Sequence, residues 1–226
     1  MRKYYEAYDD LYRQVHALGL SWTDDAPSPI VREVLARYAI GKSQRILEIG
    51  AGEGRDALGL LSDGYHLLAS DVSPEAVEYC RRKMPQYANS FTVLDAVEGM
   101  HDGTYDFIYA VAVIHMLTAD TDRAAFLAFI RNHLTDGGIA LVCSMGDGVR
   151  EYTSDSASAF DLRKRVHEPS GRELMIASTS CRTVNRESFL ELIDAAGLRV
   201  LSYEVREDVP GFDKMMCAVL TAKKER

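Results

Sequence analysis

The chain has 226 residues, and its 34 acidic and 26 basic side chains give a formal net charge of -8 at pH 7. Domains average about 150 residues, so this length favours a single domain. The composition, 47% hydrophobic and 27% charged, excludes intrinsic disorder and collagen-like repeats. The longest apolar run, Phe107–Leu117, is shorter than the roughly 20 residues of a membrane span, so no membrane partner is expected. The acidic balance disfavours a nucleic-acid partner, which usually meets a basic face.

The compartment is indicated by the first residues and by the cysteines. The start, MRKYYEAYDD, carries charges where a secretory signal needs an apolar stretch. The cysteines lie far apart without a CxxC pair, which is typical of isolated thiols in a reducing compartment; they are Cys80, Cys143, Cys181 and Cys217. We therefore expect a cytoplasmic protein without a metal site, a site built from Cys143, His167 and Cys181 being the minor alternative.

Two helices are predicted in the first 40 residues. The first is amphipathic, because aromatic and aliphatic residues recur at helical spacing; they are Tyr4, Tyr5, Tyr8, Leu11, Tyr12, Val15 and Leu18. The second begins at Ser28-Pro29, where serine can serve as the N-cap and proline as the first helical residue.

From Arg45 onwards, short apolar runs alternate with helical patterns. The predicted strands are Arg45–Ile49, Leu67–Ser70, Phe91–Leu94, Phe107–Val111 and Ile139–Cys143, and the predicted helices lie near residues 55–62, 74–84 and 122–134. Strands that are apolar on both faces and alternate with helices indicate a parallel sheet covered on both sides. The expected fold class is therefore α/β and doubly wound.

The last third predicts a helix followed by a hairpin. Asn185 can cap a helix that Gly197 ends, and strands are predicted over Arg199–Val205 and Met215–Thr221. The connection Arg206–Lys214 is shorter than the dozen or more residues that a parallel crossover needs. These two strands are therefore expected to pair antiparallel.

The strongest chemical signal is the segment Glu48–Arg55, which reads E-I-G-A-G-E-G-R between a predicted strand and a predicted helix. Such a glycine-rich turn lets a ligand approach the main chain closely. Asp71 and Asp95 end the next two strands, and a carboxylate at the first of these positions can accept hydrogen bonds from both ribose hydroxyls. Because ligands bind at the carboxyl ends of such strands, these residues should share one crevice. A turn that serves packing alone is the alternative.

The residues around the turn disfavour a phosphate ligand. The dinucleotide fingerprint needs glycine where this chain has Arg55, and Glu48 and Glu53 would repel a pyrophosphate. A phosphate loop at Gly41-Lys42-Ser43 fails because it needs a preceding strand and a glycine in place of Ala36. A cationic or zwitterionic ligand suits the acidic loop better.

The segment Arg45–Cys143 resembles the class I S-adenosylmethionine-dependent methyltransferases. The resemblance is carried by motifs in chain order: Glu48–Gly54, Asp71, Asp95, Tyr105-Asp106-Phe107-Ile108 and Leu134-Thr135-Asp136-Gly137-Gly138. It implies a Rossmann-like, seven-stranded, mostly parallel sheet with an antiparallel C-terminal strand. Gly54-Arg55-Asp56 and Gly64-Tyr65 are similar to the thiopurine and tellurite methyltransferase branch. The resemblance is weak before residue 40 and nearly absent over residues 144–182.

The resemblance implies S-adenosyl-L-methionine as cofactor and S-adenosyl-L-homocysteine as product. Gly50, Ala51 and Gly52 would pass the methionine part, and Glu48 would place its ammonium group. Arg55, at the end of the same loop, would also belong to the cofactor-binding residues. Asp71 would hold the ribose and Val72 would flank the adenine. The remaining implied contacts are Asp95 and Ala96 at the adenine amino group and Ala110 behind the methionine part.

Candidates for the acceptor side are fewer. Methyl transfer needs alignment of the nucleophile more than an acid or base, so no triad is expected. His115, after the fourth strand, is the best candidate base, with a packing role as the alternative. Tyr8 and Tyr12 could form a lid over cofactor and acceptor, or simply pack the first helix. Arg163, in the basic run Phe160–His167, could receive an anionic acceptor, with a solvated helix face as the alternative.

We therefore predict a single methyltransferase domain over residues 1–226. It comprises an N-terminal helical lid (1–40), a cofactor-binding core (41–143), an acceptor-pocket insertion (144–182) and a C-terminal helix and hairpin (183–226). The expected reaction is methyl transfer to a small-molecule acceptor. The alternatives are an RNA or protein methyltransferase and a non-catalytic S-adenosylmethionine-binding regulatory module. No residue pattern selects the oligomeric state or the acceptor atom.

Overall fold

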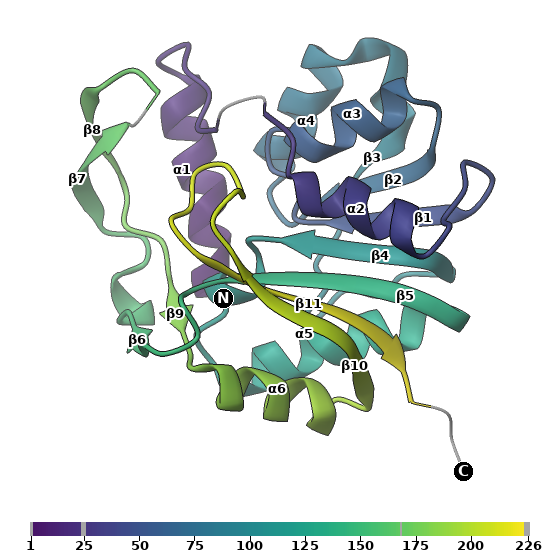
Figure 1. Ribbon diagram of the computed structural model, residues 1–226. Helices are drawn as coiled ribbons and strands as arrows, with labels where there is room; N and C mark the ends of the chain where they lie inside the picture. The colour runs from purple at the N-terminus through teal and green to yellow at the C-terminus, as the bar shows by residue number, and fades with distance from the viewer. Residues whose placement is uncertain (1, 24–25, 168, 224–226) are drawn as a thin grey trace.

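The computed structural model describes residues 2–23, 26–167 and 169–223. A seven-stranded sheet with the order β10-β11-β5-β4-β1-β2-β3 forms its centre (Figure 1). The strands are β1 (Arg45–Ile49), β2 (His66–Asp71), β3 (Phe91–Val93), β4 (Tyr105–Val111), β5 (Leu134–Met145), β10 (Leu198–Arg206) and β11 (Met215–Ala222). β11 lies antiparallel between β5 and β10, whereas β1 to β5 pair parallel with one another. The doubly wound sheet and its antiparallel C-terminal strand are confirmed.

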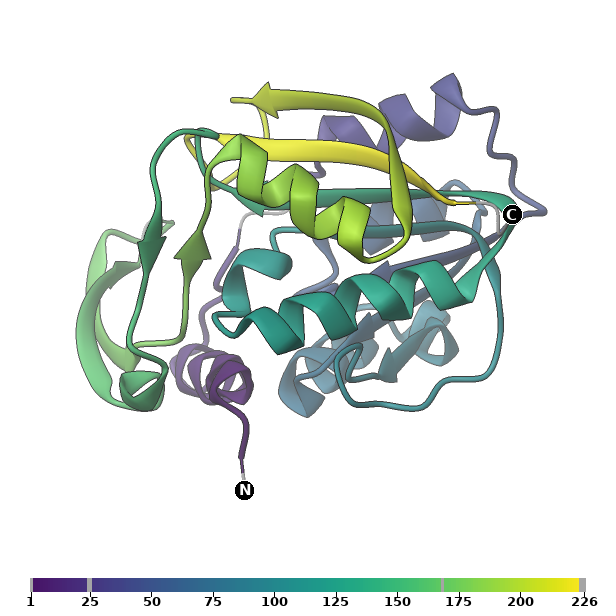
Figure 2. The same cartoon turned by 90° about the horizontal axis from the view of Figure 1, so that it is seen from below.

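Helices cover both faces of the sheet (Figures 1 and 2). One face carries α2 (Pro29–Arg37), α3 (Arg55–Ser62) and α4 (Pro74–Lys83), and the other carries α5 (Asp120–His133) and α6 (Arg186–Ala195). Short 3-10 turns follow α4 and β4, namely η2 (Pro85–Ser90) and η3 (Ile114–Met116). Ser73 and Asn185 cap α4 and α6 with their side chains, accepting from Ala76 N and Ser188 N. Each helix predicted from the sequence is present.

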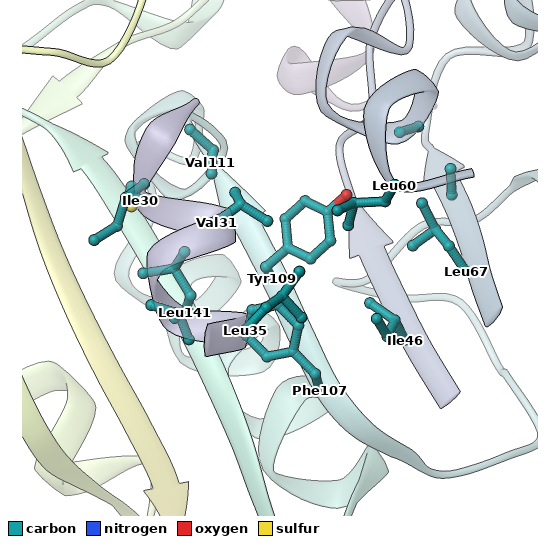
Figure 3. Close-up of a cluster of buried hydrophobic side chains, with 14 of the residues drawn as sticks. Ile30, Val31, Leu35, Ile46, Leu60, Leu67, Phe107, Tyr109, Val111 and Leu141 are labelled. Carbon is teal, nitrogen blue, oxygen red and sulfur yellow. The ribbon is translucent and has the colours of Figure 1, made fainter. Parts of the chain in front are cut away.

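The core accounts for the apolar run Phe107–Val111 of β4. Its side chains alternate, so that Phe107 and Tyr109 pack toward α2 and Ile108 and Ala110 toward α5 and α6. Figure 3 shows Tyr109 between the side chains of α2 and those of β1 and the neighbouring strands. Both faces of the strand are therefore dry, as expected for a parallel sheet with two helical layers.

The N-terminal segment takes a different place. η1 (Tyr4–Glu6) and α1 (Ala7–His16) stand at the carboxyl end of the parallel strands, beside a hairpin of β7 (Leu162–His167) and β8 (Arg172–Ala177) (Figures 1 and 2). Leu11, Tyr12 and Val15 of α1 form a small buried cluster with residues of β8. The hairpin is preceded by η4 (Ser156–Ser158) and is flanked by the paired strands β6 (Tyr152–Thr153) and β9 (Arg182–Thr183). The N-terminal helical segment and residues 144–182 thus meet over one end of the sheet.

One local expectation is wrong. The alternative for the basic run around Arg163 is a solvated helix face, but the run forms the strand β7. Strand geometry separates neighbouring side chains onto opposite faces, so Lys164 points away from Arg163 and Arg165.

Within the described ranges, no helix is both long and apolar enough to cross a bilayer. The same residues contain no group of three or more histidine, cysteine, aspartate or glutamate side chains placed to hold a metal ion. All four cysteines are unpaired thiols.

Candidate functional site

The glycine turn follows β1 and is held by its own main chain. Gly50 N and Ala51 N both donate to Ser70 O, at 2.7 and 2.8 Å, and Gly54 N donates to Ala51 O at 2.9 Å. Gly52 N donates to Asp71 Oδ2 at 2.8 Å. Because these four amides are already satisfied, the turn has few donors left for a phosphate, in agreement with the expectation from the sequence.

Glycine is required in this turn for two reasons. Gly50, Gly52 and Gly54 have φ values of 77°, 54° and 78°, in the left-handed region that other residues rarely adopt. A Cβ on Gly50 would lie only 2.3 Å from Val113 Cγ2. The turn after β1 therefore sits directly against the segment after β4, where the strand order of the sheet reverses. This is the position at which open α/β sheets bind their ligands.

A pocket opens at this position. The space between its lining residues, including the open mouth, is about 600 Å³. Its floor and walls come from the ends of the central strands and the segments that follow them: Ile49, Gly50, Asp71, Val72, Leu94, Asp95, Ala96, Val97, Val113, Met116, Leu117 and Phe126. Tyr5, Tyr8 and Tyr12 of the N-terminal segment form its roof. The lining is mostly apolar, and its charged members are both aspartates.

Asp71 is the first of these aspartates and lies at the end of β2. It is buried, and it accepts hydrogen bonds from Gly52 N and Ser73 N, each at 2.8 Å. Burial raises its pKa to about 6, although the backbone donors oppose the shift. A buried carboxylate of this kind is stabilised by further donors, and the two hydroxyls of a ribose would supply them.

Asp95 follows β3 and is oriented from two sides. Its Oδ1 accepts from Val97 N at 2.8 Å and from Glu98 N at 3.2 Å, and its Oδ2 accepts from Tyr5 Oη at 3.0 Å. Val72 and Ala96 lie beside the two aspartates and give the pocket apolar walls. An acceptor beside a flat apolar slot is complementary to an aromatic base with an amino group.

The tyrosines expected to form a lid do lie over the pocket. Tyr8 Oη donates to Ser180 O at 3.1 Å, which joins the roof to the 144–182 insertion. Tyr12 is buried, and a Cβ on Gly52 would lie 2.7 Å from its hydroxyl oxygen. Burial raises the pKa of Tyr8 to about 12, so its hydroxyl stays protonated at neutral pH.

Five residues expected at the cofactor are not among those that line the pocket. Two of them, Ala51 and Gly52, belong to the glycine turn beside Gly50, and the other three lie outside that turn. Arg55 is held elsewhere, since its guanidinium donates to Pro210 O at 3.0 Å and to Ser28 Oγ at 2.8 Å. It therefore ties α3 to neighbouring segments, and we do not include it in the site. Ala110 is buried beneath the α5 and α6 layer.

Glu48, the third of these residues, lies below the glycine turn. Its side chain is buried, and its Oε2 atom has no hydrogen-bond partner among the described residues. Burial, reinforced by the nearby Asp56, raises its pKa to about 8. A buried carboxyl oxygen without a partner calls for a donor. The Tyr109 hydroxyl, which also lacks a hydrogen-bond partner, is close enough to oppose the rise in the pKa of Glu48.

His115 and Arg163 also lie outside the described lining of the pocket. His115 is buried in η3, where its ring meets Phe212 edge-on with 5.8 Å between the ring centroids. Burial, together with the charge of Arg123, lowers its pKa to about 4, so the imidazole is neutral at pH 7. Arg163 is exposed on β7. Its basic neighbours have other partners, since Lys164 pairs with Glu173 and Arg165 covers the Trp22 ring.

Sequence reasoning missed several lining residues. Tyr5 was part of the aromatic stripe, but nothing in the spacing distinguished it from Tyr4. Val113, Met116 and Leu117 enter the pocket because the chain turns sharply after β4, where Ala112 has a φ of 62°. A non-glycine residue in that conformation leaves no sequence signature.

Comparison with known proteins agrees with this geometry. A family model described as a methyltransferase domain matches residues 47–140. A tRNA (carboxymethyluridine(34)-5-O)-methyltransferase from Saccharomyces cerevisiae is 30% identical over 54% of this chain and 42% of its own length. The chain spans only about two to three fifths of the curated relatives it matches.

Solved structures match over the whole fold. The CcbJ methyltransferase from Streptomyces caelestis superposes with a TM-score of 0.68, at 16% identity, over 98% of both chains. The glycopeptide N-methyltransferase MtfA in complex with S-adenosylmethionine gives 0.64 at 18% identity, over 87% of this chain and 95% of that one. The matched domain contains the glycine turn, Asp71 and Asp95, and the sheet has the same fold throughout. Residues 47–140 therefore match a methyltransferase domain, and the chain has the fold of the S-adenosylmethionine-dependent methyltransferases.

Proposed function

We propose that this chain binds S-adenosyl-L-methionine in the pocket between the glycine turn and the tyrosine roof. We further propose that it transfers the methyl group to a small-molecule acceptor and releases S-adenosyl-L-homocysteine. The principal support is the combination of a glycine turn with few free donors for a phosphate and two aspartates at the ends of neighbouring strands. That donor and acceptor pattern suits a nucleoside that carries a cation and no phosphate.

The proposed contacts follow from the positions of the residues. Asp71 accepts from the ribose hydroxyls, Asp95 accepts from the adenine amino group, and Val72 and Ala96 pack against the base. Gly50, Ala51 and Gly52 allow the methionine part to lie close to the main chain. Glu48 does not line the pocket, so we propose that it meets the ammonium group through water, with its unpartnered Oε2 as the acceptor.

For this reaction the protein must align the acceptor atom with the methyl group and exclude water from both. The bound cofactor supplies an electrophilic methyl group on a sulfonium, which an acceptor atom displaces in line. Val113, Met116 and Leu117 form an apolar wall, and Tyr8 and Tyr12 close the pocket from above. Such a wall excludes water from the reacting atoms and restricts the orientation of the acceptor.

A small acceptor is favoured over RNA by the arrangement of the basic residues. One relative is a tRNA methyltransferase, so an RNA acceptor is the second candidate. However, the basic run on β7 is divided between two faces, and two of its three charges are engaged by Glu173 and Trp22. Phosphate recognition generally needs a continuous basic surface. We propose that the 144–182 insertion and the tyrosine roof shape the acceptor pocket. The cytoplasmic location expected from the sequence stays a prediction.

Calorimetry with S-adenosylmethionine, S-adenosylhomocysteine and NADH tests the cofactor proposal. We expect micromolar or tighter binding of the first two, and a loss of affinity in Asp71→Asn. Asp136→Asn is the matched control, because Asp136 is an exposed carboxylate near the N-terminal end of β5, whereas the pocket lies at the carboxyl ends of the strands. Tight NADH binding without binding of either sulfur nucleoside would refute the proposal.

Release of S-adenosylhomocysteine tests the transfer reaction. Panels of small oxygen, nitrogen, sulfur and carbon nucleophiles are compared with bulk tRNA under the same conditions. Turnover with a small molecule supports the proposal, whereas turnover with tRNA alone would favour the RNA acceptor. Firm cofactor binding without turnover on either panel would favour the non-catalytic binding module.

A further inference from the structure

His16, the last residue of α1, lies between two carboxylates from different parts of the chain. Its Nε2 is 2.9 Å from Glu53 Oε1 and its Nδ1 is 2.9 Å from Glu75 Oε1. The His16 side chain is only 8% exposed and that of Glu53 is 2% exposed. Glu53 belongs to the glycine turn and Glu75 to the first turn of α4. One imidazole thus joins the N-terminal helix to the floor of the pocket.

The partners of Glu53 show that it is ionised. Its two oxygens also accept from Trp22 N at 2.6 Å, from Thr23 N at 2.8 Å and from Thr23 Oγ1 at 3.0 Å. A carboxylate that accepts this many hydrogen bonds has no proton to donate to His16. Glu75 is likewise an acceptor, because Arg82 donates to it at 3.1 Å. Both ring nitrogens of His16 must therefore donate, and the ring is an imidazolium.

The surroundings of His16 favour that charge. Tyr79 of α4 stacks on the ring with 4.2 Å between centroids, and Tyr12 of α1 stacks on it at 5.8 Å. Burial alone would lower the pKa of His16, but Glu53 and Glu75 outweigh it and raise the pKa above 6.5.

The other charged groups near His16 are already paired. Arg82 pairs with Glu75, and Asp9 pairs with Arg13 at 2.7 Å. Asp9 also accepts from Ser73 Oγ and Glu75 N, so a second contact joins α1 to the start of α4.

We propose that His16 is a positioning residue for the cofactor: its imidazolium, held between Glu53 and Glu75, docks α1 so that Tyr5, Tyr8 and Tyr12 close the pocket. This proposal rests on the proposed function, because the pocket must take S-adenosylmethionine for the roof to matter. Loss of the proton removes one of the two donors and leaves a carboxylate facing a ring nitrogen lone pair. The docking of α1 is then weakened, because one of the two hydrogen bonds of His16 is lost.

The direction of the pH effect follows from the raised pKa. The docked state of α1 holds the proton more tightly than the undocked state, in which His16 has its ordinary pKa near 6.5. The docking contribution is therefore complete below pH 6.5 and is lost as the pH rises through the higher pKa of the docked state. Cofactor affinity should weaken on the alkaline side.

The test measures the affinity for S-adenosylhomocysteine by calorimetry between about pH 6 and pH 9. Glu48 titrates in the same range, with a pKa of about 8, so the effect of His16 is the difference between the wild type and His16→Gln. We expect wild-type affinity to fall by about tenfold across this range beyond any fall in the variant, since each hydrogen bond to a charged group contributes substantially. His66→Gln, an exposed histidine at the start of β2, is the matched control and should behave as the wild type.

Two further measurements keep the outcome decisive if His16→Gln folds poorly. Glu75→Gln leaves Glu53 and its backbone donors in place and should flatten the pH dependence as well. Nitrogen NMR of the wild type should show both ring nitrogens of His16 protonated at pH 7. A neutral ring, or identical pH profiles in the wild type and the variants, would overturn the inference. Failure of the wild type to bind either sulfur nucleoside at any pH would instead refute the proposed function.

Discussion

The floor and the roof of the pocket are built in different ways. The floor is main chain: the glycine turn donates to Ser70 O and to Asp71, and it follows directly from strands buried in the sheet. The roof is a helix docked through side chains, with His16, Asp9 and Tyr5 making its polar contacts to the floor. Disruption of the floor therefore disturbs the folded core, whereas the roof can be released while the sheet stays intact.

This difference sets the order of the expected effects. Substitutions in the glycine turn strain the backbone and should have the largest effect. Those that remove a carboxylate from the pocket should come next, and single contacts between roof and floor should follow. Residues that neither line the pocket, nor join roof and floor, nor are proposed to meet the cofactor should have little effect on its affinity.

Gly50→Ala should be the most damaging single change. The left-handed backbone costs a non-glycine residue about 1–2 kcal/mol, and a Cβ placed 2.3 Å from Val113 Cγ2 adds about 1–3 kcal/mol of overpacking. We expect the free energy of unfolding, measured with urea, to fall by the sum of these terms and cofactor binding to become undetectable.

Two companion variants separate the two causes of that loss of stability. Val113→Ala in the Gly50→Ala background should remove the overpacking and recover that part of the free energy of unfolding, while the backbone strain remains. Gly64→Ala has a φ of 82° and open space around its Cβ, so it should show the strain alone. If Gly50→Ala were no worse than Gly64→Ala, the close contact between the two segments would be refuted.

Asp71→Asn tests the carboxylate of the floor. Its affinity for S-adenosylmethionine should fall by about tenfold or more, because a charged acceptor is lost from a buried site. Burial raises the pKa of Asp71 to about 6, so the free protein takes up a proton as the pH falls through that value. Bound ribose hydroxyls favour the ionised form, and wild-type affinity should therefore weaken below about pH 6. Calorimetry at pH 5 and pH 7 should show this dependence in the wild type and not in Asp71→Asn.

The same contrast explains how much could be predicted from the sequence. The floor is local in sequence: strand periodicity, glycine spacing and an acidic residue at each strand end are enough to place Gly50, Asp71 and Asp95 in one crevice. The hairpin β10–β11 is predictable because its connection is too short for a crossover. In each case the signal and the element it predicts lie within a few residues of each other.

The roof and the acceptor side could not be predicted in this way, because they depend on contacts between distant segments. Tyr5 and Asp95 are in contact although most of the cofactor-binding core lies between them in the sequence. The contact of Tyr8 with Ser180 joins the N-terminal segment to the insertion. Arg55 follows the glycine motif directly, yet its side chain turns toward Ser28 and Pro210. A motif thus fixes the path of its main chain more firmly than the direction of its long side chains.

Tyr5→Phe tests one contact between roof and floor. It removes the hydroxyl that donates to Asp95 Oδ2 and leaves the ring in place. One such hydrogen bond contributes about 0.5–1.5 kcal/mol, so cofactor affinity should fall by about twofold to tenfold. Tyr4→Phe is the control, because Tyr4 Oη donates to Asp122, outside the pocket. Equal losses in the two variants would indicate a general loosening of the N-terminal segment.

His115→Asn should have the smallest effect on the cofactor, since His115 is buried and is not among the residues that line the described pocket. Affinity for S-adenosylhomocysteine should stay within about twofold of the wild type. If His115 merely packs, turnover should also be retained. A large loss of turnover with unchanged affinity would restore it as an acceptor-side residue.

His115 should instead affect the stability of the fold at acidic pH. Its pKa in the folded protein is lowered to about 4 from 6.5, so the unfolded chain takes up the proton first as the pH falls. The wild type should therefore lose stability as the pH falls from about 6.5 toward 4, and His115→Asn should lose less.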